Sequence, residues 1–387
     1  MIAYNRQSLD NLHLQTEAQD AFGKKVITSD EYDRIRGAYP FHFYLPNFFI
    51  RIGFFILTTI AAACGLGLFM LMGIGGSSEG LLYGIMVGYG LLAFGALELF
   101  IHNRKMFGSG VDDALLWVGS FLIVLGIDLS TNDTLQPVPK CLLILVIALV
   151  GMLRYTDRVM TLFAYAASLG LVFYTLKDGR PVVRTLLPFV IMGLSIGGYF
   201  LFTRLQQQDR LRHYRSCLQV LRIATLLSLY LAGNYYIVRE LNATLSGSSG
   251  PVALGWLWWL LTAAIPVFFI VKGIQRKDTL FLWTGMALVA GSVFTVRYYY
   301  HWLPTETAMV VGGIILIAGV YGLTRYLRTP KQGFTAAAPD YPHVLENLPV
   351  EGLVLAETFS TVAAPAPDTG VQFGGGTTGG GGAGGQF

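Results

Sequence analysis

The chain of 387 residues is long enough for one large helical domain with tails, and its composition is that of a membrane protein. Hydrophobic residues make up 53% of the chain, charged residues only 13%, and the mean hydropathy is +0.55. The net charge of +4 is scattered over short loops, which argues against a nucleic-acid-binding surface. The cysteines, Cys64, Cys141 and Cys217, lie in or beside apolar segments, so no disulfide framework is expected.

Residues 1–45 predict a cytoplasmic helical hairpin that leads into the membrane domain. Two short helices are expected, over 8–22 and 29–38. Thr28 and Glu31 have the spacing of a capping box, in which each side chain satisfies a backbone donor of the other residue. No basic stretch leads into a short apolar core here, so we expect no cleavable signal peptide.

Ten apolar segments are candidates for membrane-spanning helices, since a helix needs about 20 apolar residues to cross the hydrocarbon core. Seven are clear: 52–72, 81–101, 183–202, 217–238, 252–271, 280–296 and 308–323. Residues 160–176 form an eighth, shorter one. Residues 114–127 and 141–153 have only about 13 or 14 apolar residues each, so this pair either crosses twice or is re-entrant. The prediction is an all-α transmembrane bundle of about ten spans over residues 46–328.

Lysine and arginine residues predict the orientation of this bundle. With the N-terminus in the cytoplasm, fourteen of them fall in cytoplasmic loops and six in the opposite loops. Because short cytoplasmic loops are enriched in these residues, both ends of the chain are predicted to be cytoplasmic, with an even number of spans. Omitting both short segments would leave every later orientation unchanged.

Aromatic clusters mark the opposite face. Trp256, Trp258 and Trp259 begin one predicted span, and Tyr298, Tyr299, Tyr300 and Trp302 follow the next. Such clusters are typical of the belt at the membrane interface, which we prefer to a ligand cage.

Two glycine pairs have the four-residue spacing that lets helices approach closely. They are Gly84 with Gly88 and Gly193 with Gly197. We expect them to pack helices within the chain, with dimerisation as the alternative.

Polar residues within spans are costly, so they are the first candidates for function. They are Glu98, His102, Arg222, Asn234 and Asp128. Glu98 and His102 lie one turn apart on one helical face and could exchange a proton. Arg222 is deep enough to pair with an acid, and Asn234 is expected on about the same face of the same helix. Each of them can instead be a solvated helix-end residue with a structural role.

No motif of an enzyme or a cofactor site is found. Asp112 and Asp113 open the span that Asp128 closes, which places them near water. The histidines are spread one to a segment without metal-ligand spacing, and there is no phosphate-binding loop or nucleophile elbow. We therefore expect no catalytic, cofactor-binding or metal-binding residues, and the sequence gives no support to an enzyme.

The chain changes character after Arg328. Proline, alanine, threonine and acidic residues dominate up to Asp368, and the chain ends in FGGGTTGGGGAGGQF at residues 373–387. Residues 329–387 are predicted to be disordered. This ending resembles the glycine-rich C-termini of several bacterial envelope proteins, including some TPM-domain proteins, which implies docking to an envelope partner. The alternative is a plain solvated tail.

The N-terminal pattern GKKVITSDEYDRIRGAYP, running into PNFFIRIGFFILTTI, resembles a family of bacterial multi-pass membrane proteins of unknown function. The resemblance implies a cytoplasmic helical motif before a multi-span domain. The glycine-rich tail and the Tyr- and Phe-rich composition favour a Gram-negative inner membrane. It supplies no activity and no site residues. Some relatives carry the label of carotenoid-cleaving oxygenases, but the scattered histidines and the absence of a propeller pattern argue against that activity here.

Three classes of function remain. The leading hypothesis is an envelope-associated anchor or assembly component that recruits partners through the hairpin and the tail. The alternative is a small-solute or ion transporter or channel with Glu98, Arg222 and Asn234 along its path, although no repeat of one half in the other is visible. The third is an intramembrane enzyme acting on a lipid-type substrate, for which no motif is found. The expected partners are the lipid bilayer and envelope proteins, not nucleic acid.

Overall fold

A computed structural model describes most of the chain up to residue 299. The described residues are 2–299 without 24, 42, 45, 74–78, 105–106, 132–134, 178, 180, 247–251 and 277, together with 314, 317, 321, 322 and 325. They form an all-α structure, and nine of its helices are long and apolar enough to cross a membrane. The predicted class of a multi-pass helical bundle is therefore confirmed. The tail at 329–387 and nearly all of the predicted span 308–323 lie outside the described residues.

The described helices follow one another from residue 6 to residue 299. Their bounds are α1 (Arg6–Gly23), α2 (Ser29–Ala38), α3 (Phe48–Gly73), α4 (Glu79–Arg104), α5 (Val111–Ser130), α6 (Pro137–Tyr155), α7 (Arg158–Leu176), α8 (Pro181–Gln206), the 3-10 helix η1 (Asp209–Tyr214), α9 (Arg215–Gly233), α10 (Tyr235–Ser246), α11 (Gly255–Arg276) and α12 (Thr279–Tyr299).

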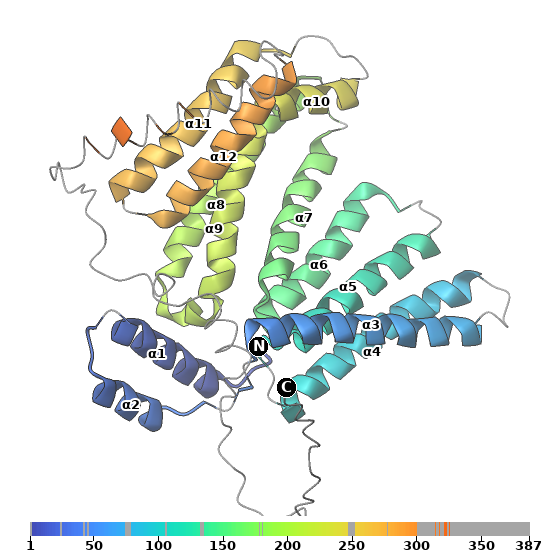
Figure 1. Ribbon diagram of the computed structural model, residues 1–387. Helices are drawn as coiled ribbons and strands as arrows, with labels where there is room; N and C mark the ends of the chain where they lie inside the picture. Colours follow the sequence, from blue (N-terminus) through green and yellow to red (C-terminus); the bar gives the residue numbers. More distant parts are fainter. Residues whose placement is uncertain are drawn as a thin grey trace, which may run out of the picture.

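Neighbouring long helices pack as antiparallel pairs, and these pairs form two halves. The pairs are α4 with α5, α6 with α7, α8 with α9 and α11 with α12, while α3 packs on α5. Helices α3 to α7 converge at one end and spread apart at the other (Figure 1). Helix α7 packs on α8 and α9 and so joins the halves. Among the nine candidate spans, α9 and α5 are the most buried, which makes them the centres of their halves.

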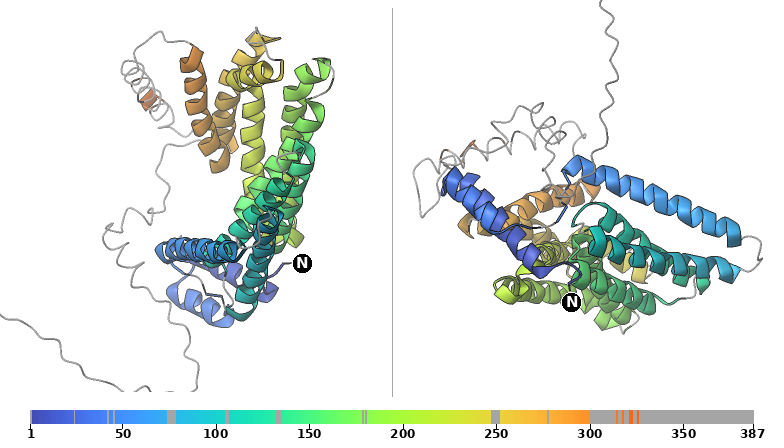
Figure 2. Two further views of the ribbon diagram at one scale, coloured as in Figure 1. Left: turned by 90° about the vertical axis from the view of Figure 1, so that its right-hand side faces the viewer. Right: turned by 90° about the horizontal axis from the view of Figure 1, so that it is seen from below.

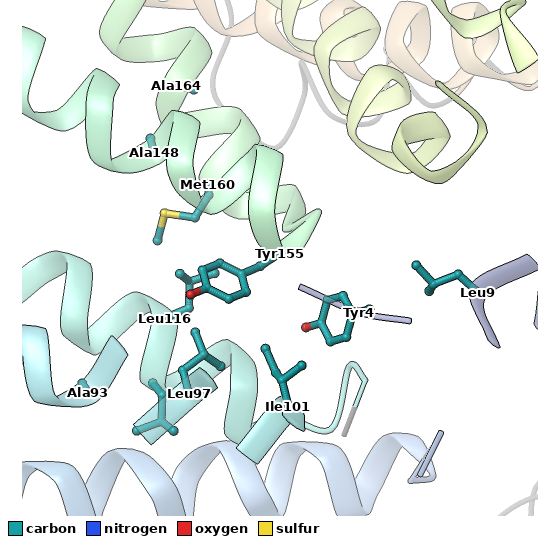
Figure 3. Packing of buried hydrophobic residues seen from close by; sticks show 11 residues of the cluster. Tyr4, Leu9, Ala93, Leu97, Ile101, Leu116, Ala148, Tyr155, Met160 and Ala164 are labelled. Carbon is teal, nitrogen blue, oxygen red and sulfur yellow. The ribbon is translucent and has the colours of Figure 1, made fainter. Parts of the chain in front are cut away.

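Each half has its own apolar core. In the first half, Leu97, Leu116, Tyr155 and Met160 pack together with the N-terminal Tyr4 (Figure 3). In the second half, the core lies between α9, α11 and α12, and its members are Leu226, Tyr230, Ile265, Phe269, Phe281 and Leu288. The inclusion of Tyr4 means that the N-terminal segment is packed into the bundle.

The N-terminal hairpin has the two predicted helices and the predicted capping box. The backbone N–H of Glu31 donates to Thr28 Oγ1 at 3.3 Å, and that of Thr28 donates to Glu31 Oε2 at 2.8 Å. The backbone N–H of Thr28 holds the pKa of Glu31 below its ordinary value. Phe22 of α1 stacks on Tyr32 of α2. Both helices lie beyond one end of the long helices (Figure 2).

The two short predicted spans are long enough in the structure to cross a bilayer. Helix α5 has 20 residues and α6 has 19, which gives each a length of about 30 Å. Near its start, α5 is paired with the first turn of α3 through Arg51, and near its end Asp128 is paired with Lys140 of α6. The two helices therefore run from one end of the bundle to the other and back, which favours full crossing over a re-entrant loop.

The predicted span 217–238 is wrong at its end, because the helix breaks at Asn234. Its backbone is extended, with φ −81° and ψ 129°, and α9 stops one residue before it. Asn234 Oδ1 accepts the backbone N–H of Tyr236 at 2.9 Å. This bond caps the start of α10. With 12 residues, α10 is too short to span, and Asn234 does not continue the helical face of Arg222.

The predicted packing role of the two glycine pairs is also wrong. A methyl group on Gly84, Gly88, Gly193 or Gly197 would meet nothing within 4 Å among the described residues, so none of these helices uses the pair to pack on another described helix. Other glycines bring helices together instead. A Cβ atom on Gly90 of α4 would lie 2.8 Å from the carbonyl oxygen of Gly119 in α5, a distance that real Cβ atoms do not adopt.

Candidate functional site

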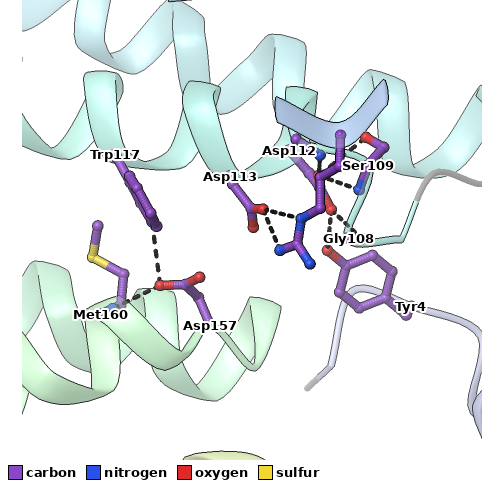
Figure 4. Close-up of polar contacts among 10 residues, drawn as sticks. Tyr4, Gly108, Ser109, Asp112, Asp113, Trp117, Asp157 and Met160 are labelled. Atoms are coloured by element: carbon purple, nitrogen blue, oxygen red, sulfur yellow. Dashed lines mark hydrogen bonds and ion pairs between the residues drawn. The ribbon is translucent and has the colours of Figure 1, made fainter. Parts of the chain in front are cut away.

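A polar cavity of about 300 Å³ lies where the first half of the bundle meets the N-terminal segment and η1. The charged residues of its lining are Arg51, Asp112, Asp113, Asp157 and Arg158, and His213 lies beside them. Aromatic side chains complete the wall, namely Trp117 of α5, Tyr155 of α6, Tyr4 of the N-terminal segment and Phe107 of the connection between α4 and α5. Three carboxylates, two arginines and aromatic rings thus surround one space. Figure 4 shows Asp112, Asp113 and Asp157 together with Tyr4 and Trp117.

Asp112 organises the turn that precedes α5. Its carboxylate accepts the backbone N–H groups of Gly108 at 2.7 Å, Ser109 at 2.9 Å and Gly110 at 3.1 Å. The side chain is buried, and these three bonds compensate for the loss of water. Gly110 has a φ of +90°, and a Cβ atom there would collide with the backbone of Arg51, so the turn requires glycine.

Asp113 joins α5 to α3 at the cavity wall. Its Oδ2 accepts from Arg51 Nη2 at 2.5 Å and from Nε at 3.2 Å. About half of the Arg51 side chain is exposed, whereas Asp113 is 17% exposed, so the acid is the shielded member of the pair. The pair fixes the orientation of the first membrane helix against the third.

Asp157 begins α7 and contacts α5. Its Oδ1 accepts the backbone N–H of Met160 at 2.6 Å as the helix cap and the indole N–H of Trp117 at 3.3 Å (Figure 4). Burial raises the pKa of Asp157 above its ordinary value, and the two donors act in the opposite direction. Sequence reasoning missed this residue, although an aspartate directly before an apolar run is a recognised signal of a helix start.

The structure does not bring Glu98 and His102 together. Glu98 Oε1 accepts from Arg154 Nε at 2.5 Å and from Tyr155 OH at 2.6 Å, both from the end of α6. His102 is exposed on α4, and no contact joins it to Glu98 among the described side chains. Glu98 therefore ties α4 to α6 near the cavity.

Arg222 was predicted to lie deep enough in its span to pair with an acid, and in the structure this acid is Asp278. The guanidinium donates to Asp278 Oδ2 at 3.2 Å, to Gln206 Oε1 at 2.8 Å and to Tyr199 OH at 3.4 Å. Its side chain is only 14% exposed. Asp278 lies in the connection between α11 and α12, where the sequence offers no local sign of a contact with α9. Arg222 thus joins α8, α9 and that connection.

The other two candidates lie at the end of the bundle that is distant from the cavity. Asp128 pairs with Lys140 at 2.7 Å between α5 and α6. The Asn234 amide donates to Tyr230 OH at 2.8 Å and to Thr295 Oγ1 at 2.9 Å, which links α9 to α12. The five candidates are therefore spread over different contacts and do not form one site.

Buried hydroxyl groups connect the two halves within the membrane region. Ser228 of α9 bonds to Tyr165 of α7 at 2.6 Å and to Ser195 of α8 at 2.8 Å. Ser195 and Ser228 are almost fully buried. Hydrogen bonds of this kind hold helices together in lipid, and these serines also bond to backbone carbonyls of their own helices.

The described residues of the predicted aromatic belt lie together at one end of the bundle. The Tyr235 ring stacks on Trp259 with centroids 4.6 Å apart, and Tyr299 lies edge-on to both. Trp258 is an exception, because it is buried and donates its indole N–H to the carbonyl of Ala253. Tyr300 and Trp302 lie outside the described residues.

The chain matches no family model, no curated protein and no solved structure with which it was compared. Among the described residues, no group of three or more His, Cys, Asp or Glu side chains is placed to hold a metal ion. The fold and the contacts define a multi-pass helical membrane protein with a polar cavity at one end of its bundle.

Proposed function

We propose that the chain is a multi-pass anchor of the bacterial inner membrane that holds its N-terminal hairpin at the cytoplasmic surface for protein partners. The observation that carries the proposal is the docking of α1 on the bundle. Asp10 pairs with Arg212 of η1 at 2.5 Å, and His13 contacts Arg215 at the start of α9 at 3.2 Å. On its other side, the segment before α1 bonds through the Ala3 N–H to the carbonyl of Arg154 at 2.9 Å.

The state of the polar candidates supports an anchor over a conduit. Glu98, Asp128 and Arg222 each have an oppositely charged partner from another element. A transport path would need ionisable or hydrated groups that can exchange partners along the length of the bundle. Glu98 and Asp128 instead lie near helix ends, and Arg222, inside α9, is held by Gln206 at the end of α8 and by Asp278 in the α11–α12 connection. The hydroxyl groups of Ser195 and Ser228 are bonded to neighbouring helices.

The proposed orientation follows from the chain's basic residues. The hairpin lies at the end of the bundle that holds Arg154, Arg212 and Arg215, which belong to the loops with the excess of lysine and arginine. An inner-membrane location with this end in the cytoplasm agrees with that excess.

Site-directed photo-crosslinking in the native host tests the proposal. A photoreactive residue at Val26, which is 72% exposed in the hairpin loop, is expected to give a discrete protein adduct. The matched position is Leu57 of α3, which is 64% exposed on an apolar helix and should react with lipid only. Reversal of the nearby exposed charge, Asp30→Lys, should weaken the Val26 adduct. No adduct at Val26, or the same adduct from Leu57, would contradict an anchoring role for the hairpin.

A small-solute transporter remains the second candidate because of the polar cavity. Three carboxylates beside aromatic rings are suited to a cationic or polyhydroxylated solute. This function would require a hydrated route from the cavity past Ser228 to the other end of the bundle. Reagent access to Ser195 and Ser228 therefore separates the two functions.

A further inference from the structure

We propose that residues 2–23 form a removable cap that closes the polar cavity, with Tyr4 as its plug and Asp10 as its latch. This inference goes beyond the anchoring function, since the cap would control access to the cavity whether or not the hairpin binds a partner. It rests on three features of the described chain: how Tyr4 is seated, how α1 is attached, and how little apolar surface α1 buries.

Tyr4 is seated in the cavity as a plug. Its side chain is 6% exposed, and its ring packs edge-on against Phe107 at 4.9 Å and Phe43 at 6.3 Å. The phenol donates to Asp112 Oδ2 at 3.4 Å, which is a long hydrogen bond (Figure 4). Burial and the negative charge of Asp112 raise the pKa of Tyr4, so the phenol stays a neutral donor.

The latch lies about two helical turns further along the chain. Asp10 contacts both Arg212 at 2.5 Å and His213 at 3.4 Å, and His213 also lines the cavity. The Arg212 side chain is 48% exposed, so water can replace its partner when the latch opens. The latch therefore holds the cap at the cavity rim through a partly solvated ion pair, in which Asp10 is 28% exposed.

Helix α1 buries little apolar surface, as expected of a part that can detach. Leu9 and Ala18 are its only buried residues. The hairpin is held together internally, because Asn11 donates to the carbonyl of Pro40 and Gln15 to that of Tyr39, both at 2.7 Å. Segments with few buried contacts open at low free-energy cost while the rest of the protein stays folded. The cap would therefore move together with α2, to which these bonds join it.

A cysteine inside the cavity reports the state of the cap. Ser216 lines the cavity, and Ser216→Cys would be placed in a full-length version whose three native cysteines are replaced by alanine. The measurement is the rate of labelling by a water-soluble maleimide. Asp10→Arg should raise that rate about tenfold, the factor that 1.4 kcal/mol produces. Tyr4→Ala should raise it by at least as much.

Two controls separate cap opening from general loosening. Asp20→Arg makes the same charge change on an exposed position of α1 and should leave the rate unchanged. The double variant Asp10→Arg with Arg212→Asp restores an ion pair at the latch and should return the rate towards its starting value. Each variant is also tested for a monodisperse peak in detergent.

Several results would overturn the proposal. They are unchanged labelling in both cap variants, equal acceleration by Asp20→Arg, failure of the charge swap to slow labelling, and loss of the folded protein in Asp10→Arg. The last result would make the segment part of the folding core. The labelling rates do not depend on a partner, so failure of the anchoring function leaves this test unaffected.

Discussion

Replacement of Arg222 by methionine tests whether this side chain is structural. Methionine keeps the apolar stem of the arginine and removes its charge, so the hydrogen bonds to Asp278, Gln206 and Tyr199 can no longer form. We expect a protein that still inserts with all of its spans but unfolds at a lower temperature. If Arg222 served transport alone, stability would be unchanged or improved by the removal of a buried charge.

The magnitude follows from the burial of the ion pair. Exposed pairs contribute about 0–1 kcal/mol, and breaking a buried pair costs about 3–5 kcal/mol. With Arg222 14% exposed and Asp278 28% exposed, the pair lies between these cases, so we expect a loss of about 2–3 kcal/mol. This loss corresponds to a fall in Tm of about 3–4 °C for a chain of this size.

The partner offers a clean second variant for a double-mutant cycle. Asp278 Oδ1 also accepts the backbone N–H of Leu280 at 3.0 Å, and asparagine can keep this bond while it removes the charge. Asp278→Asn should therefore cost less than Arg222→Met, with a coupling free energy of about 1–2 kcal/mol between them. Arg210→Met, at an exposed site in η1, is the matched control. The assay is thermal unfolding followed by size-exclusion chromatography. A Tm equal to that of the control, or a coupling near zero, would refute a structural role for the pair.

Three further predictions concern the helix contacts and caps. Gly90→Ala should destabilise the protein by about 1–3 kcal/mol, because its methyl group would collide with the backbone of α5. The control Gly84→Ala should change the Tm little. A loss of stability in both variants would show that α4 packs differently. Asp157→Asn keeps the cap of α7. Because burial raises the pKa of Asp157, its ionisation lowers stability as pH rises through that pKa. The variant should therefore gain Tm over the native chain as pH rises through the pKa of Asp157 and keep a constant advantage above it; a pH-independent difference would contradict this. Thr28→Ala should speed amide exchange in the first turn of α2. In the native chain the same protection should be lost as pH falls through the lowered pKa of Glu31, and a flat profile would count against the capping box.

Local signals in the sequence predicted the elements well. The capping box of Thr28 and Glu31 specified the start of α2, because both partners are three residues apart. Hydropathy located all nine described spans, since lipid requires long apolar helices. The exception is Asn234, where a polar residue inside an apolar run ends the helix by capping the next one. An asparagine within a span can continue a helix or begin a new one, and hydropathy does not distinguish these outcomes.

Contacts between distant elements could not be predicted. Arg222 needed an acid, but the choice of Asp278 depends on how the α11–α12 pair sits against α9. The cavity likewise requires Tyr4, Asp113 and Asp157, which are far apart in the sequence. The periodicity of hydrophobic residues does not predict that these side chains line one cavity. The prediction that the glycine pairs pack helices together was wrong for a related reason. Four-residue spacing shows that two glycines share a helix face, whereas the helix that faces them is set by the fold.

Reagent access to single cysteines at Ser195 and Ser228 in intact cells tests most directly whether the membrane bundle is a closed anchor. Both side chains are almost fully buried at the junction of α7, α8 and α9. Exposed positions outside the spans, such as Asp20 and Asp30, provide the reference rate. We expect the two interior positions to resist small water-soluble reagents after the exposed positions have reacted. Labelling of Ser195→Cys or Ser228→Cys at the reference rate would reveal a water-filled path and make transport the function.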